Sequence, residues 1–87
     1  MAGSDASQQR PGWRARNTPG ERWRLHKAGC GHYRQAVCEL QSHALGLELR
    51  LVVDGSDLRN SRLLPEGHDV LGVVEEWKAA MVERGWS

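Results

Sequence analysis

The spacing of apolar residues changes once along this chain, at Pro65, and this change constrains the fold more than any other feature. Over residues 21–64 apolar side chains fall at alternate positions, which is the period of strands that bury one face. Over residues 66–84 they recur every three or four residues, as they do in an amphipathic helix. A run of strands followed by a single helix predicts an α+β fold of two layers.

Turn signals divide the strand region into three or four strands that follow one another as an antiparallel meander. The expected strands are residues 21–26, 34–42, 47–53 and 58–64, and the expected turns are residues 28–31, 43–46 and 54–55. Asp54 and Gly55 form the clearest hairpin signal, because both tolerate a positive φ. Leu58 and Leu63 have opposite parity, which predicts a bulge or an early end in the fourth strand.

Alternation assigns the strand residues to a buried face and an open face. On the buried face we expect Trp23, Leu25, Ala36, Cys38, Leu40, Leu47, Leu49, Leu51 and Val53. On the open face we expect Arg22, Arg24, His26, Arg34, Val37, Glu39, Gln41, Glu48, Arg50 and Val52. The helix is expected to cover the buried face with Val70, Val73, Val74, Trp77, Ala80 and Met81. Beyond it, Gly85 suits the C′ position, and Trp86 is expected to fold back on Met81 or Val82.

The first twenty residues are polar and contain three Gly and two Pro. They cannot bury enough apolar surface to offset their ordering entropy, so they predict a flexible basic tail before a single domain at residues 21–87. Trp13 is the one large apolar residue in this tail and has no place in the expected core. The net charge of +1 is divided unevenly, since residues 1–34 carry seven basic and two acidic side chains, and residues 35–87 carry five and nine.

Two sets of side chains have the types needed for metal binding or hydrolysis, but their positions disfavour both. A tetrahedral zinc site would draw on Cys30, His32, Cys38 and His43. Their spacing matches no standard zinc finger, and parity directs Cys38 inward and His43 outward. A hydrolytic triad would draw on Ser42, His43 and either Asp54 or Asp57, yet neighbours on a strand point to opposite faces. We therefore expect no metal, no cofactor and no enzymatic activity, and a small zinc-dependent or hydrolytic enzyme ranks third among the functional hypotheses.

The favoured hypothesis is a non-catalytic interaction module that binds a protein or a second copy of itself through the open face. That surface would comprise Val37, Glu39, His43, Arg50 and Val52. The alternative is a nucleic-acid-binding accessory protein led by Arg14, Arg16, Arg22 and Arg24. An antiparallel sheet with arginines on its open face and a helix behind it resembles in outline the plant AP2-type and integrase-arm DNA-binding domains, which read DNA with the sheet. Glu39 and Glu48 favour the first hypothesis, because cross-strand pairing with arginines accounts for both signs of charge.

A wider resemblance covers a little over half of the chain. From Cys38 to Trp86 the text CELQSHALGLELRLVVDG…EEWKAAMVERGW looks like a group of short bacterial open reading frames with no assigned activity. The resemblance implies strands followed by a helix and supplies no catalytic residues. Ten Arg against two Lys, with no Phe, also suits a bacterial origin. No secretory h-region and no apolar stretch of membrane-spanning length is found, so we expect a cytoplasmic protein without a membrane partner.

Overall fold

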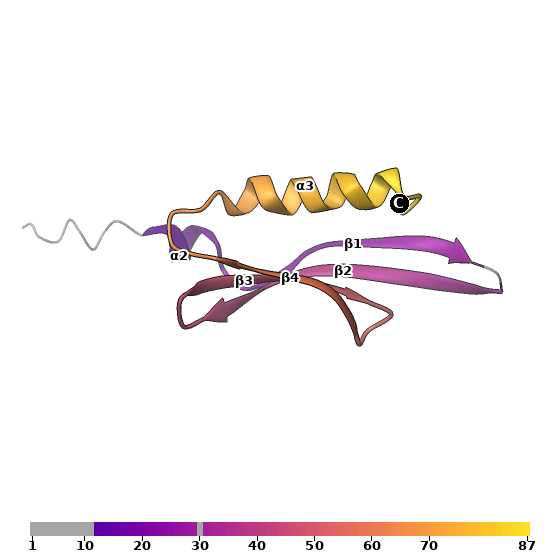
Figure 1. The fold of residues 1–87 in the computed structure, drawn as a ribbon, viewed down its shortest axis with the longest axis horizontal. Coiled ribbons are helices and arrows are strands. Elements are labelled where there is room, and N and C mark those ends of the chain that lie inside the picture. The colour runs from indigo at the N-terminus through magenta and orange to yellow at the C-terminus, as the bar shows by residue number, and fades with distance from the viewer. Residues whose placement is uncertain (1–11, 30) are drawn as a thin grey trace, which may run out of the picture.

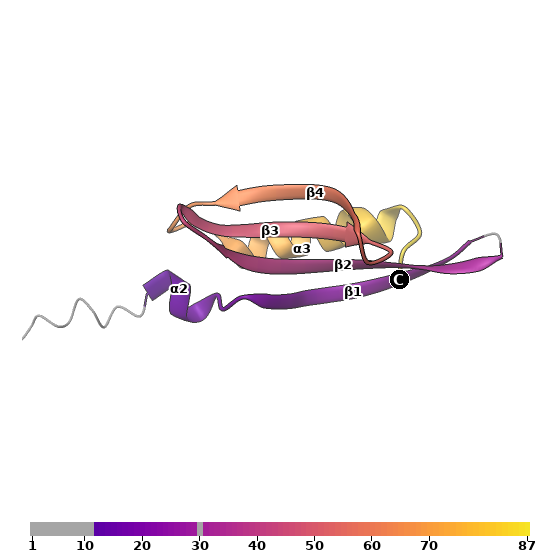
Figure 2. The same cartoon turned by 90° about the horizontal axis from the view of Figure 1, so that it is seen from below.

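A computed structural model describes residues 12–29 and 31–87, and it confirms the α+β fold. The elements are α2 (Gly12–Arg16), β1 (Gly20–Gly29), β2 (His32–His43), β3 (Gly46–Val53), β4 (Asp57–Leu64) and α3 (Val70–Glu83). The four strands form one antiparallel sheet in the order β1-β2-β3-β4. The helix α3 runs along one face of this sheet, and no described element covers the other face (Figures 1 and 2).

The second and third turns and the bulge of the strand region follow the sequence prediction. The first turn is shorter than the expected residues 28–31, because β1 continues to Gly29 and β2 begins at His32. Asp54 and Gly55 both have positive φ, 54° and 84°, and link β3 to β4. The register of β4 shifts between its pairings with Leu51 and Val52, which leaves Arg59 as the extra residue of a bulge. A second bulge, which alternation alone did not predict, lies at Arg22 in β1.

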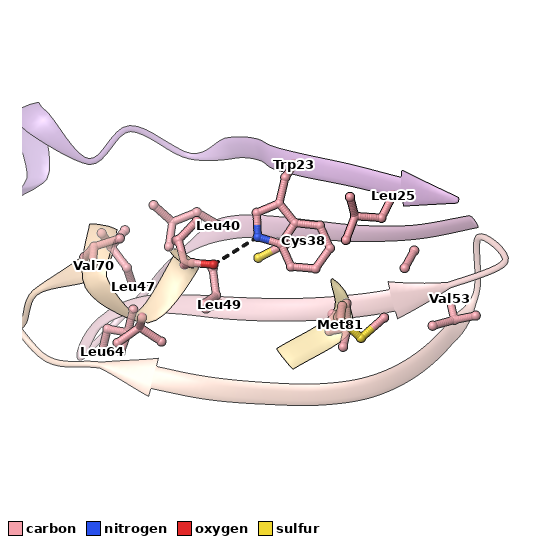
Figure 3. Packing of buried hydrophobic residues seen from close by; sticks show 14 of the residues in the cluster. Trp23, Leu25, Cys38, Leu40, Leu47, Leu49, Val53, Leu64, Val70 and Met81 are labelled. Atoms are coloured by element: carbon pink, nitrogen blue, oxygen red, sulfur yellow. Dashed lines mark hydrogen bonds between the residues drawn. The ribbon is translucent and has the colours of Figure 1, made fainter. Parts of the chain in front are cut away.

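The core lies between α3 and the inner face of β1, β2 and β3 (Figure 3). Its strand residues include all those expected from alternation: Trp23, Leu25, Ala36, Cys38, Leu40, Leu47, Leu49, Leu51 and Val53. Leu64 at the end of β4 is fully buried in addition. The helix contributes Val70, Val73, Val74 and Met81, while Trp77 is only partly buried. The indole Nε1 of Trp23 donates a hydrogen bond of 3.1 Å to the carbonyl of Val74, so the largest strand side chain is tied directly to the helix.

Trp13 belongs to this core, which corrects the interpretation that it has no structural role. Its side chain is 7% exposed, and its Nε1 donates a 2.8 Å hydrogen bond to the carbonyl of His68. The short helix α2 carries Trp13 against the chain segment that leads into α3. The polar neighbours of Trp13 hide this role, because a single large aromatic side chain is enough to dock a segment. Of the tail expected over residues 1–20, residues 1–11 lie outside the described part of the chain.

The helix α3 is shorter at its start than the expected span of residues 66–84. It begins at Val70, because the carboxylate of Asp69 accepts a hydrogen bond from the amide of Gly72 and caps the first turn. It ends as predicted: the amides of Gly85 and Trp86 donate to the carbonyls of Val82 and Met81, which is the Schellman pattern. None of the helices in the described residues is both long and apolar enough to cross a membrane.

The chain beyond α3 returns to the sheet. Trp86 is buried, and Ser87 exchanges two backbone hydrogen bonds with His26 of β1, at 2.7 and 2.9 Å. This pairing covers part of the outer edge of β1 and places the end of the helix beside the β1–β2 hairpin (Figure 2).

Candidate functional site

The candidate site is the sheet face that α3 leaves uncovered, which we call the open face. Strand register arranges the side chains on the central part of this face in three rows across the sheet. The first row is Arg24, Val37, Val52 and Leu58. The second row is Glu21, Glu39, Arg50 and Ser61. The third row is Gln41, Glu48 and Leu63.

The first row forms an apolar strip across β2, β3 and β4. Val37 and Val52 lie directly opposite each other and are half-buried. Leu58 continues the strip on β4 and is 47% exposed, and Leu63 on the same strand is 37% exposed. Exposed leucines beside paired valines give this face an apolar patch that solvent contacts in the described structure.

A polar network crosses the centre of the open face. Gln41 donates to Glu39 at 3.0 Å, and Arg50 donates through Nη1 to Gln41 at 3.3 Å. Glu39 and Arg50 are also direct cross-strand neighbours. The Nε atom of Arg50 is buried and has no acceptor among the described residues. Arg50 is thus held in the sheet surface and does not extend into solvent as a free cation.

The second arginine of the open face is also engaged. Arg24 forms an ion pair of 2.7 Å with Glu21, and the bulge in β1 brings the two side chains together. The hydrogen bond between them lowers the pKa of Glu21 and raises the pKa of Arg24. With Glu39 and Glu48, the open face carries three carboxylates and two guanidinium groups. The open face is therefore close to neutral.

The remaining predicted site residues lie away from the apolar strip. The side chain of Arg22, at the bulge, donates hydrogen bonds to the carbonyls of Thr18 and Gly20, so it folds back on the residues just before it in the chain. Arg14 donates to the carbonyl of His43, which brings these two predicted residues together at the end of β2. Arg16 is exposed on α2.

Arg34 is not on the open face, contrary to the sequence analysis. It is paired in register with Lys27 and lies on the α3 side of the sheet, over the ring of Trp86. The physical reason is its parity: it is two residues from the buried Ala36, with no bulge between them. Its Nε bonds to the carboxylate of Asp54 at 3.2 Å.

The structure does not assemble the candidate zinc ligands. His32 and His43 stand at opposite ends of β2, and eleven residues of extended strand separate them by about 36 Å. Cys38 is fully buried between them, and burial raises the pKa of its thiol to about 12. Cys30 lies outside the described residues. Within residues 12–29 and 31–87, no three His, Cys, Asp or Glu side chains are grouped so that they could hold a metal ion.

The candidate triad is also dispersed. The imidazole Nδ1 of His43 accepts a hydrogen bond from the backbone amide of Leu45 and so caps the β2–β3 turn. Asp54 lies near the other end of β2, where its carboxylate accepts the amide of Gln35. That hydrogen bond from the Gln35 amide is the main cause that lowers the pKa of Asp54, and the guanidinium group of Arg34 lowers it further. Asp57 is paired with Arg59 at 2.6 Å.

Sequence reasoning missed Leu58 and Leu63 as members of the open face. Their opposite parity was the available signal: one bulge between them returns both side chains to the same side of the sheet. The predicted bulge is present at Arg59, and it is this extra residue that places Leu58 and Leu63 on the same face of the sheet.

Comparison of the chain with protein-family models, with curated proteins and with solved structures finds no match. The fold and the open face therefore define the class directly: a small two-layer α+β domain with one uncovered sheet face.

Proposed function

We propose that this chain is a non-catalytic interaction module that associates with a second copy of itself through the open face. The observation that carries the proposal is the apolar strip made of the half-buried Val37 and Val52 and the exposed Leu58, which lies beside a row with charges of both signs. A sheet with one face uncovered gains stability when a second apolar layer covers it. The buried, unpaired Cys38 thiol suits a reducing compartment such as the cytoplasm.

The open face is suited to pairing with itself. In a symmetric dimer each surface meets its own copy, so the patch must be self-complementary. A two-fold axis in the interface, running along the strands between β2 and β3, exchanges the positions of these two strands. It sets each Val37 against Val52 of the other copy and each Glu39 against Arg50 of the other copy. For these residues of β2 and β3, apolar contacts and opposite charges are matched by a single symmetry operation, which also sets Leu58 against Arg24 of the other copy.

The size of the face limits the affinity. Four strands about 4.8 Å apart and about eight residues long present a face of roughly 500 Å². Standard interfaces bury about 800 Å² on each partner, so this one falls below that size. We therefore expect a reversible dimer with a dissociation constant in the micromolar range, on the order of 10 µM.

Sedimentation equilibrium of two matched leucine variants tests the proposal. Leu58→Arg places a charge in the apolar strip at a side chain that is already 47% exposed, so the fold should tolerate it. Leu71→Arg makes the same change at a side chain that is 68% exposed on α3, which lies on the other side of the sheet from the open face (Figure 1). We expect the unmodified chain and Leu71→Arg to dimerise equally. Leu58→Arg should weaken dimerisation at least about ten-fold, because the two-fold axis sets position 58 against Arg24 of the other copy and like charges across an interface repel each other.

Two outcomes contradict the proposal. One is a monomer of 9.7 kDa for the unmodified chain at all concentrations up to the millimolar range. The other is equal loss of the dimer in both variants, because the effect would then come from added charge and not from the open face. If the chain is monomeric, a different protein becomes the partner to seek for this surface.

A further inference from the structure

A second surface feature lies on the opposite side of the sheet, at the end of α3. It is a cavity of about 230 Å³ with four cationic side chains in its wall. They come from four separate elements: Lys27 from β1, Arg34 from β2, Arg59 from β4 and Arg84 from the end of α3. The cavity is therefore built by the tertiary fold and not by one basic segment.

Trp86 holds two of these cations in place. Lys27 and Arg34 are direct cross-strand neighbours on the part of the β1–β2 hairpin that extends beyond β3 (Figure 2). Each places its charge 5.9 Å from the centre of the Trp86 ring. Lys27 also donates to the carbonyl of Arg84 at 2.9 Å, which links the hairpin to the end of the helix. These contacts restrict both side chains before any ligand binds.

The bulge in β4 supplies the third cation. Arg59 is the extra residue of that bulge, which lets its side chain reach the cavity. Both Arg59 and Arg34 use Nε to bond a carboxylate, Asp57 and Asp54 respectively. Neither carboxylate lines the cavity, so the two acids orient the guanidinium groups from outside it.

The cavity has an excess of positive charge. The four cations are opposed by the two carboxylates, and no described carboxylate forms an ion pair with Lys27 or Arg84. Holding four like charges around one hollow costs electrostatic free energy, which an anion in the hollow would recover. The arginine guanidinium offers paired N–H donors whose geometry matches the oxygens of a phosphoryl group.

We propose that this cavity binds a small dianion bearing a phosphoryl group, either inorganic phosphate or a small phosphomonoester. Cavities for drug-sized ligands measure about 300–1,000 Å³, and this one is smaller at about 230 Å³, so it suits a single small anion. The site lies on the α3 side of the sheet and does not depend on the proposed dimer.

The test is a nuclear magnetic resonance titration of the whole chain with inorganic phosphate, at ionic strength held constant with chloride. A second titration uses glycerol phosphate, a phosphomonoester. We expect saturable shifts of the Trp86 indole and of the amides around Lys27, Arg34, Arg59 and Arg84. Tighter binding of phosphate than of glycerol phosphate identifies the free ion as the ligand, and the reverse order identifies a monoester; either result supports the site.

Two arginine variants make the test specific. Arg84→Gln removes a cation that has no ion pair in the described structure, and the helix cap formed by its backbone remains. Arg62→Gln removes another exposed charge, from a residue of β4 that is paired in register with Leu49 and lies outside the cavity. We expect Arg84→Gln to raise the dissociation constant about ten-fold or more and Arg62→Gln to change it less than about two-fold.

The proposal is overturned if neither anion produces site-specific shifts at concentrations up to about 10 mM, a range that covers weak millimolar binding. It is also overturned if chloride alone produces the same shifts, or if both arginine variants weaken binding equally. In those cases the effect reflects general screening of a basic surface.

Discussion

At the scale of single residues, the two tryptophans Trp13 and Trp23 illustrate what alternation can and cannot predict. Trp23 lies in β1, and its polar neighbours Arg22 and Arg24 mark it as an inward position despite the bulge at Arg22. Trp13 stands among polar residues, where no period exists, and only the tertiary structure shows that its indole reaches His68. The prediction of Arg34 on the open face was wrong for a different reason. Arg34 is two residues from the inward Ala36 in the same strand, so alternation itself places it on the inner side of the sheet.

The burial of Trp13 leads to a prediction on stability. We expect Trp13→Ala to lower the free energy of unfolding by about 3–5 kcal/mol, the range for removing a buried large aromatic side chain. Trp13→Phe keeps most of the apolar contact and loses the hydrogen bond to His68, so it should cost about 1 kcal/mol. Urea unfolding monitored by circular dichroism measures both. Unchanged stability in Trp13→Ala would show that α2 is not docked on the core.

At the scale of elements, the change of period at Pro65 correctly separated strands from helix, and the turn chemistry located the β3–β4 hairpin. Element boundaries were less accurate, because they depend on local bonds that periodicity does not contain. The start of α3 is the clearest case: acidic residues at positions 66 and 69 both suit a first turn, yet only Asp69 caps the helix. The bulge at Arg22 depends in the same way on pairing with β2, which no single strand reveals.

The cap of α3 can be tested with the two acids themselves. We expect Asp69→Ala to destabilise the fold by about 1 kcal/mol, since the amide of Gly72 loses its acceptor. Glu66→Ala removes the same charge three residues earlier, outside the helix, and should change stability by less than about 0.5 kcal/mol. Thermal or urea unfolding of the pair measures the difference. Equal effects would mean that the charge near the helix start matters and the hydrogen bond does not.

At the scale of the whole molecule, two groups of basic residues lie at opposite ends of the described chain. Arg14 and Arg16 lie on α2 near the end of β2, whereas the cationic cavity is lined by Lys27 and Arg34 of the β1–β2 hairpin. Figure 1 shows α2 and this hairpin at opposite ends of the sheet. The open face between them is nearly neutral. The uneven division of charge along the chain is visible in the sequence. The cavity is not, because its four cations meet only when four elements have packed together.

This distribution gives a prediction for the nucleic-acid alternative. Binding of a duplex backbone is driven by cations that contact its phosphates. Two of the arginines proposed for this role bond instead to groups of their own segment: Arg22 to the carbonyls of Thr18 and Gly20, and Arg24 to the carboxylate of Glu21. We expect no mobility shift of a short DNA duplex at about 50 mM salt, where non-specific electrostatic binding is strong. A shift that disappears when Arg14 and Arg16 are changed to Gln would instead support the nucleic-acid hypothesis and point to α2 as its contact.

The two indole hydrogen bonds also bear on the order in which the chain can fold during synthesis. Every strand pairs with the strand next to it in sequence, so each hairpin can form as soon as its second strand has been made. The indoles of Trp13 and Trp23, in contrast, bond to carbonyls 55 and 51 residues further along. Neither bond can form until the segment around α3 has left the ribosome. The sheet can therefore be assembled before its core is closed, and its apolar face stays open to water until the last fifth of the chain arrives.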